Sequence, residues 1–444
     1  MLCEKFLERM KNILGVEAFQ CYLEAFQKSP DRALRFNRIK CGEKKKLGLD
    51  GALLKRLDFW DGAWTFSHDK IGTHPYHHAG AVYVQEPSAM VPLSSIDIPV
   101  TARVLDMCAS PGGKTSQAAE YATDGFIVSK EIIPSRAKTL SGNIERLGFK
   151  NVTVTNTDTN TLAKLFPECF DLVIADAPCS GEGMFRKDEG AIAEWSEENV
   201  LMCARRQREI LENAAECTAG GGYLIYSTCT FSLEENEENV GFFLASHPEF
   251  TLVTPSERSA LASVSGIGYT ECRRLYPHTG DGEGQFFAVF KKNDGKRGEF
   301  SDKSGLAKLP EKDLLIIKKF MSEYLESIPR GEIMLFKDNA VLIPEDLPVP
   351  AKVTYSCGVT LGRVEKGVFR PHHQLFSALG CLFKNRIELS HDSDEIRKYL
   401  HGDTFETDAR DSWAVVTVDS VPLGGVKVTG GVAKNHYPKG LRNM

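Results

Sequence analysis

Short apolar runs alternate with amphipathic stretches through the middle of the chain. Runs of this length suit strands that are buried on both faces better than they suit helices. The stretch from Pro134 to Leu147 has helical spacing and stops at Gly148. The expected strands are 103–107, 126–129, 152–155, the two runs that end at Asp176 and Tyr226, and 285–290. The alternation predicts an α/β fold, doubly wound around a mostly parallel sheet of seven strands.

The two ends of the chain have different patterns. The N-terminal segment begins with two helical patterns, and residues 291–308 are polar and contain glycine, as in a linker. Beyond the linker, the pattern predicts an amphipathic helix, a hairpin at 333–343 and further short strands, giving an α+β region. The expected domains are a small α+β lobe at 1–95, a central α/β domain at 96–295 and a C-terminal α+β region at 305–444.

Composition narrows the class of protein. The chain has 444 residues, of which 42% are hydrophobic, but no apolar run approaches the roughly 18 residues of a membrane span. The first residues lack the apolar core of a signal peptide, so we expect a cytoplasmic protein. The 12 cysteines contain no CxxC pair, which argues against a zinc ribbon or a disulfide framework. We expect no metal site, because His74, His77 and His78 have no nearby ligand partners; these and His372 and His373 are predicted at the surface.

Charge does not by itself indicate nucleic-acid binding. The net charge is −6, so any RNA contact has to come from a local patch. The basic segment, Lys28 to Arg56, carries ten basic and three acidic residues, including Lys44, Lys45 and Lys46. On charge alone, a solvated face of the small lobe explains this segment best.

The segment from Cys108 to Lys114 joins a strand to a helix through small residues. Its glycines allow the backbone to approach a ligand, and the first turn of the helix offers free N–H groups to an anion. The segment has neither GxGxxG spacing nor a P-loop. Acidic residues end the next strands, at Glu131, Asp158 and Asp176, and together they fit an adenosine-bearing cofactor lying across the sheet edge.

Two cysteines, Cys179 and Cys229, follow the strands that end at Asp176 and Tyr226. Pro178 forces its segment to turn out of the sheet, and Arg186 and Lys187 lie close enough in sequence to lower a thiol pKa. Two thiols beside a cofactor edge indicate covalent chemistry.

The spacing of Ser232 and Glu235 predicts a capping box. A helix that starts there would place Cys229 just ahead of a helix N-terminus, where the dipole favours a thiolate.

Four motifs together resemble the RNA 5-methylcytosine methyltransferases of the Nol/Nop/Sun family. The motifs are CASPGGK at 108–114, DAPCSGEG at 176–183, FRKD at 185–188 and YSTCTF at 226–231. The resemblance spans residues 80–292 and implies a class I, Rossmann-like methyltransferase fold that uses S-adenosylmethionine. Residues 30–37 resemble the family's N-terminal RNA-binding lobe. Residues 362–371 and 435–442 resemble the carboxyl region of bacterial members, which includes a PUA-like module.

The resemblance also implies roles for single residues. Cys229 would be the nucleophile, and Cys179 would assist release of the methylated RNA. Contacts with S-adenosylmethionine are implied for Cys108, Ala109, Ser110, Pro111, Gly112, Gly113, Lys114, Glu131, Asp158 and Asp176. Ser110 stands where the family usually has alanine, a change that conserves size.

The implied partner is RNA. The cytosine would have to leave its stack, so we expect RNA contacts from the basic segment, including Arg35 and Arg38, from Lys187 and from the C-terminal module. The C-terminal resemblance favours rRNA of the small ribosomal subunit over tRNA. A non-catalytic RNA-binding assembly factor is the third alternative, and the intact cysteine pair argues against it.

Overall fold

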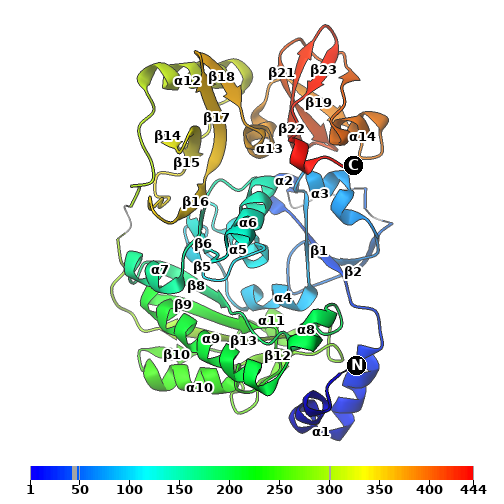
Figure 1. The fold of residues 1–444 in the computed structure, drawn as a ribbon, viewed down its shortest axis with the longest axis vertical. Helices are drawn as coiled ribbons and strands as arrows, with labels where there is room; N and C mark the ends of the chain where they lie inside the picture. The colour runs from blue at the N-terminus through cyan, green and yellow to red at the C-terminus, as the bar shows by residue number, and fades with distance from the viewer. Residues whose placement is uncertain (1, 43–47, 50, 300–301, 444) are drawn as a thin grey trace.

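The computed structural model describes residues 2–42, 48–49, 51–299 and 302–443, and within these ranges the strands form four sheets. Figure 1 shows the largest sheet at the centre of the molecule, with the N-terminal lobe beside it and the C-terminal region above it.

Seven strands of the central sheet have the order β12-β13-β9-β8-β5-β6-β7. The strands from β9 to β7 run parallel, whereas β13 is antiparallel to both of its neighbours. Their bounds are β5 Arg103–Asp106, β6 Phe126–Lys130, β7 Val152–Thr155, β8 Phe170–Asp176, β9 Thr218–Thr228, β12 Arg273–Leu275 and β13 Gln285–Lys292. Strands β10 (Phe250–Leu252), β11 (Val264–Ser265) and β16 (Thr354–Cys357) extend the sheet. The predicted doubly wound α/β fold is confirmed.

Helices cover both faces of this sheet because its strands are apolar on both sides. One face carries α4 (Pro87–Met90), α5 (Gly113–Tyr121) and α6 (Pro134–Leu147), and the other carries α7 (Thr159–Leu165), α9 (Glu197–Cys217) and α10 (Glu237–Ser246). Helix α6 ends as predicted, at Gly148, which has a φ of +77°. The carboxyl ends of the parallel strands therefore lie along one edge, where their loops meet.

The N-terminal lobe combines a broken helix with a small sheet. Helix α1 (Glu4–Phe26) changes direction at Gly15, which separates the two predicted helical patterns. Phe6 of α1 packs against Phe185 and Trp195 of the central domain. The sheet has the order β2-β3-β1-β4. The remaining elements are β1 Ala33–Phe36, α2 Arg38–Cys41, β2 Leu53–Arg56, β3 Ala63–Phe66, α3 Pro75–His78 and β4 Val82–Gln85.

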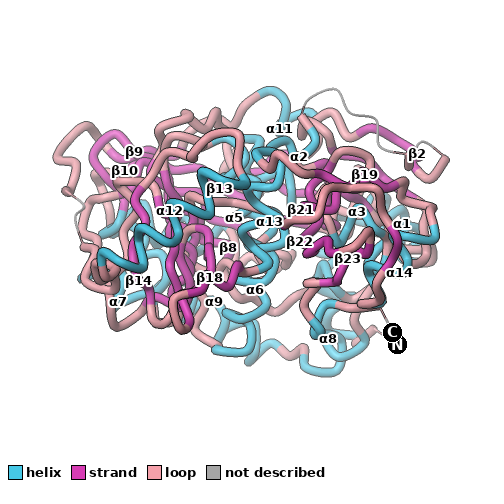
Figure 2. Tube along the Cα trace, turned by 90° about the horizontal axis from the view of Figure 1, so that it is seen from above, coloured by secondary structure: helices cyan, strands magenta, loops and turns pink. Residues whose placement is uncertain are grey.

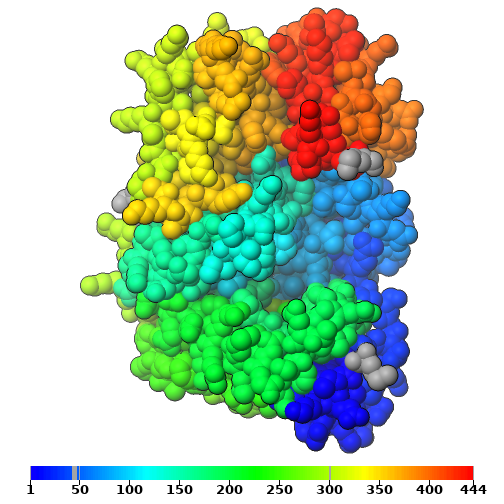
Figure 3. All heavy atoms as spheres, in the orientation of Figure 1, coloured from blue at the N-terminus to red at the C-terminus, as the bar shows by residue number. Residues whose placement is uncertain are grey.

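The C-terminal region contains two sheets, and α13 (His373–Leu379) lies between them (Figure 2). Their orders are β14-β15-β17-β18 and β19-β21-β22-β23-β20. Leu34 and Phe66 of the N-terminal lobe share a hydrophobic core with Ile387 and Val416 of the second sheet. In Figure 3 this region forms the yellow-to-red top of the molecule. The bounds are α12 Glu311–Tyr324, β14 Glu332–Phe336, β15 Asn339–Ile343, β17 Val359–Glu365, β18 Val368–Pro371, β19 Arg386–Leu389, α14 Asp394–His401, β20 Phe405–Glu406, β21 Trp413–Val418, β22 Val421–Thr429 and β23 Val432–Asn435.

Helices long and apolar enough to traverse a membrane are not found in the described ranges.

Arg35 is not an RNA contact, because its side chain is completely buried. The guanidinium forms an ion pair with Glu120 at 2.7 Å and donates hydrogen bonds to Gln85, Ser116 and the carbonyl of Gly113. Its place in the basic segment predicts an exposed side chain for Arg35, but its partners lie in β4 and α5. Arg35 therefore joins the N-terminal lobe to the helix that follows the predicted cofactor loop.

We expect Arg35→Ala to destabilise the protein by about 3 kcal/mol or more, because it leaves the Glu120 carboxylate buried without its cation. Urea denaturation of the two proteins measures this difference. Arg56→Ala is the matched control: Arg56 is exposed and its ion pair is with Asp58, at 3.5 Å and also exposed, so its loss should change stability by less than about 0.5 kcal/mol. Equal stability of Arg35→Ala and the unmodified protein would contradict the structural role.

Candidate active site

The predicted cofactor loop connects β5 to α5 at the carboxyl edge of the sheet. Gly112 has a φ of +111°, a conformation that favours glycine, and comes directly before the first helical residue. Asp106 at the end of β5 accepts a hydrogen bond of 2.7 Å from the Thr115 hydroxyl, which fixes the loop to the helix. The other carboxylate oxygen of Asp106 is buried and has no hydrogen-bond partner among the described residues. The loop is thus held in place, and the unpartnered Asp106 oxygen next to it is free to accept a hydrogen bond.

The acidic residues lie at the same edge but differ in their surroundings. Glu131 is buried, accepts a hydrogen bond from the Ile133 amide at 2.9 Å and pairs with Arg136 at 3.4 Å. Asp158 is exposed and caps α7 through the amide and hydroxyl of Thr161, which lower the pKa of its carboxyl. Glu131 is therefore held in place, whereas the carboxylate of Asp158 already has the local role of a helix cap.

Lys114 and Asp176 connect the cofactor loop to the strand that precedes Cys179. The Lys114 ammonium is buried and lies 2.8 Å from Asp176 Oδ2. Asp176 Oδ1 accepts hydrogen bonds from Ser227 at 2.6 Å and from Gln285 at 3.2 Å. The charged pair thus links α5 to β8, β9 and β13 at the edge where the cysteines follow.

The structure brings Cys179 and Cys229 together, with their Sγ atoms 3.2 Å apart. The two thiols follow the neighbouring strands β8 and β9, and both side chains are half-buried. The hydrogen bond to Cys229, together with burial, raises the pKa of the Cys179 thiol well above its ordinary value. The two sulfurs are within hydrogen-bond distance, and either thiol can donate its S–H to the other.

The predicted capping box is wrong. Helix α10 begins at Glu237 and its N-cap is Asn236, so Ser232 and Glu235 do not cap it. The Ser232 hydroxyl donates to Glu182 at 2.6 Å, while Glu235 accepts hydrogen bonds from Ser180. Neither side chain caps α10, because each binds a buried group of the Cys179 segment instead.

Arg186 and Lys187 pair with Glu283 instead of a thiol, at 3.2 Å and 3.5 Å. They also donate to backbone carbonyls of the N-terminal lobe, including those of Ser29 and Asp31. The expected lowering of a thiol pKa by these cations is therefore wrong, because a buried carboxylate neutralises them.

The basic segment is only partly exposed. Arg38 is exposed and lies 5.1 Å from the centre of the Tyr121 ring, whereas Lys40 is half-buried and donates to the carbonyls of Ala79 and Arg146. Lys44, Lys45 and Lys46 lie outside the described residues.

The histidines are less exposed than predicted. His373 is buried, and burial lowers the pKa of His77 to about 3 and that of His74 to about 4. Among the described residues, no group of three or more His, Cys, Asp or Glu side chains is arranged to hold a metal ion.

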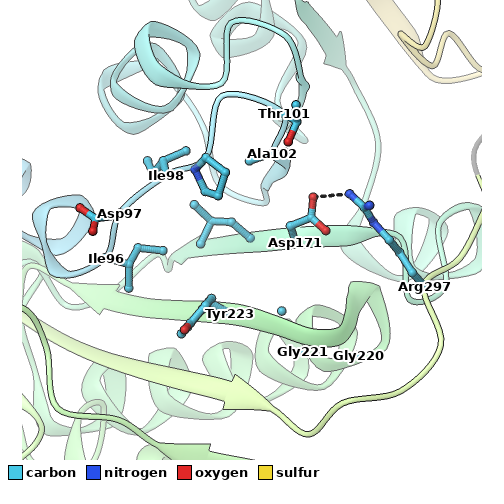
Figure 4. Close-up of a pocket in the computed structure, with 13 residues that line it drawn as sticks. Ile96, Asp97, Ile98, Thr101, Ala102, Asp171, Gly220, Gly221, Tyr223 and Arg297 are labelled. Carbon is cyan, nitrogen blue, oxygen red and sulfur yellow. Dashed lines mark hydrogen bonds and ion pairs between the residues drawn. The ribbon is translucent and has the colours of Figure 1, made fainter.

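A cavity of about 330 Å³ lies at the opposite edge of the central sheet (Figure 4). Its walls include Ile96, Ile98, Tyr223 and the ion pair between Asp171 and Arg297. Asp171 is near the amino end of β8, and none of the lining residues belongs to the predicted site. The cavity is therefore separate from the thiols.

Three family models match successive parts of the chain. They are described as the N-terminal domain of 16S rRNA methyltransferase RsmF at residues 2–87, 16S rRNA methyltransferase RsmB/F at residues 97–291, and the methyltransferase RsmF PUA domain at residues 384–443. The predicted PUA-like module in the C-terminal region is confirmed.

Among solved structures, a methyltransferase homolog from Pyrococcus horikoshii is 26% identical, with a TM-score of 0.54 over 66% of this chain and 100% of its own. NSun6 from the same organism, determined with SFG, is 20% identical, with a TM-score of 0.58 over 66% of this chain and 99% of its own. The likeness to NSun6 supports the methyltransferase fold of the central domain.

Curated relatives match over almost their whole length. Three of these relatives are named ribosomal RNA small subunit methyltransferase F. The one from Klebsiella pneumoniae is 30% identical over 99% of this chain and 96% of the relative. The one from Vibrio vulnificus is 31% identical over 99% of this chain and 97% of the relative. The relative in Serratia proteamaculans is 32% identical over 98% and 95%. The predicted resemblance is confirmed, and the chain belongs to the RsmB/F family of 16S rRNA methyltransferases.

Proposed function

We propose that this protein transfers a methyl group from S-adenosylmethionine to carbon 5 of a cytosine in small-subunit rRNA, through a covalent adduct with Cys229. The observation that carries the proposal is the 3.2 Å separation of the Cys179 and Cys229 Sγ atoms at the cofactor edge of a methyltransferase domain. A methyltransferase that acts on an oxygen or an exocyclic nitrogen has no chemical need for two adjacent thiols.

A thiol is needed for this reaction because carbon 5 of cytosine is a poor nucleophile and has to be activated before it can take a methyl group. Addition of the Cys229 thiolate to carbon 6 forms a C–S bond and makes carbon 5 electron-rich enough to take the methyl group. Carbon 5 then loses its proton, and the electron pair of that C–H bond restores the ring double bond as the C–S bond breaks. Cys179, which faces the Cys229 sulfur, is placed to assist this last step.

The cofactor loop suits the adenosine and methionine parts of S-adenosylmethionine, which supplies an electrophilic methyl group when it is bound. The buried, unpartnered oxygen of Asp106 and the free N–H groups at the start of α5 offer hydrogen bonds. Glu131 is positioned for a ribose diol. The residues proposed to hold the cofactor are those of the loop from Cys108 to Lys114, with Glu131, Asp158 and Asp176.

RNA is the proposed partner, since a target cytosine has to leave its stack to reach the thiols. Within the proposed domains at 1–95 and 305–444, the exposed Arg38 and the PUA module are candidate contacts. Lys187, whose side chain is 24% exposed, is a further candidate although it pairs with Glu283.

Transfer of labelled methyl groups from S-adenosylmethionine tests the substrate directly. Isolated small ribosomal subunits or their rRNA should be labelled, and bulk tRNA should not. Labelling of tRNA alone would favour the same chemistry on tRNA, and the absence of labelling in any RNA would favour a non-catalytic assembly factor.

We expect Lys114→Ala to lower the rate of methyl transfer by about 10- to 100-fold, because it removes a charge-assisted contact to Asp176 beside the cofactor loop. Initial rates with labelled S-adenosylmethionine measure this effect, and a thermal melt checks that the variant is folded. Lys138→Ala, which removes an exposed lysine from α6, is the control and should retain the full rate. An unchanged rate in Lys114→Ala would argue against this role for the pair.

A further inference from the structure

The segments that carry the two cysteines are tied to each other directly behind the thiols. The residues that follow Cys179 and Cys229 are Ser180 and Thr230, and their hydroxyl groups lie 2.8 Å apart. The Gly183 amide also donates to the carbonyl of Cys229 at 2.8 Å. These links fix the relative position of the two segments more tightly than the pairing of β8 with β9 alone.

Glu235 lies at the centre of this connection, with none of its surface exposed. Its carboxylate accepts hydrogen bonds from the Ser180 amide at 3.0 Å and the Ser180 hydroxyl at 2.5 Å. A third hydrogen bond, of 2.7 Å, comes from Gln207. In the part of the chain that the structure describes, no cation forms an ion pair with this carboxylate, and burial raises its pKa to about 7. Burial of a carboxylate that is held only by neutral donors costs stability.

Gln207 extends the same network to the other side of Cys179. Its amide group donates to the carbonyl of Pro178 at 3.0 Å as well as to Glu235. The single proton of the Tyr226 hydroxyl is shared between Gln207 Oε1, at 3.0 Å, and the backbone carbonyl of Glu235. The peptide groups before and after Cys179 are therefore both held by the network centred on Glu235.

We propose that Glu235 is a positioning residue that holds Cys179 against Cys229 by way of Ser180 and Thr230. This inference rests on the proposed function, because it assigns Glu235 to the release step that Cys179 assists. The Glu235 carboxylate bonds directly to the residue next to Cys179, whereas its link to Thr230, next to Cys229, runs through the Ser180 hydroxyl. Its loss should therefore impair release of the methylated RNA more than attack by Cys229.

Glu235→Gln is the sharpest test, because it keeps the shape of the side chain. The amide oxygen can still accept from the Ser180 and Gln207 amides, but the NH₂ then faces the Ser180 hydroxyl, which has to accept instead of donate. All three hydrogen bonds also lose the assistance of the negative charge, so the hold on Ser180 is weaker. We expect turnover to fall about ten-fold or more, and the fraction of enzyme in a covalent RNA adduct on a denaturing gel to rise about ten-fold. The rate of adduct formation in a single turnover should change by less than about three-fold. Glu235→Asp, which keeps the charge, should restore part of the turnover.

Glu182→Gln is the matched control. Glu182 is equally buried and connects the same two segments, but its partners are the Phe231 amide, the Ser232 hydroxyl and the Trp195 indole. This substitution should lower the melting temperature without increasing the adduct. Ser180→Ala, which removes the hydroxyl link but keeps the amide, should increase the adduct less than Glu235→Gln does.

The double variant Cys179→Ala with Glu235→Gln should accumulate no more adduct than Cys179→Ala alone, because both changes act on one step. Reduced turnover in Glu235→Gln without more adduct would overturn the positioning role, as would equal accumulation in Glu182→Gln. If Glu235→Gln does not fold, absence of accumulation in Ser180→Ala overturns it instead. Failure of Cys179→Ala itself to trap RNA would contradict the proposed function, which separates the two results.

Discussion

Cys229→Ala is expected to lower methyl transfer to RNA by about 1,000-fold or more, because carbon 5 of cytosine does not attack a methyl group until a nucleophile has added to carbon 6. The Cys229 thiol lies at the end of β9 beside Cys179, and the Lys114–Asp176 pair anchors the cofactor loop at the same edge. The change removes one half-buried sulfur whose side-chain partner, among the residues that the structure describes, is Cys179. The variant should therefore remain folded while its chemistry is lost.

Labelled methyl transfer measures this loss, and a thermal melt measures folding. Cys381→Ala is the control, since Cys381 is an exposed free cysteine in the C-terminal region and should be dispensable. Full activity in Cys229→Ala would remove Cys229 as the nucleophile.

Cys179→Ala is expected to give a different failure: an adduct that forms but does not resolve. Cys229 remains able to attack in this variant, but the thiol that faces its sulfur at 3.2 Å is gone. If Cys179 assists the last step, the methylated RNA stays attached to Cys229, and most of the enzyme becomes a covalent complex. A denaturing gel separates this complex from free protein, and nuclease treatment should return it to the mobility of the protein.

The same gel also tests the assignment of the two thiols. A trapped complex from Cys229→Ala, with none from Cys179→Ala, would reverse their roles.

The sequence predicted much of the central domain because the signals there are local. The strands are short apolar runs, α6 ends at a glycine with positive φ, and the predicted cofactor residues and cysteines follow strand ends that a parallel sheet brings to one edge. The order of the strands in the sheet does not have to be known for this conclusion, since all the parallel strands share the same edge.

Predictions about charged residues failed where their partners lie far away in the sequence, and Arg35 and Glu235 are two examples. Arg35 was assigned to RNA, but it pairs with Glu120 across a boundary between structural parts. Glu235 has the spacing of a helix cap, but it binds Ser180 of another segment. A local pattern gives no information about such partners. The sequence does show that a hydroxyl residue follows each cysteine, at Ser180 and Thr230, which is a signal for a hydrogen bond between the two cysteine segments.

Bisulfite sequencing of small-subunit rRNA tests the central claim most directly, because 5-methylcytosine resists the deamination that converts cytosine. The rRNA should be compared between cells with the unmodified protein, cells without it and cells with only Cys229→Ala. We predict at least one cytosine that is protected with the unmodified protein and converted in the other two. Identical maps in all three would contradict the proposal that this protein methylates carbon 5 of an rRNA cytosine through Cys229.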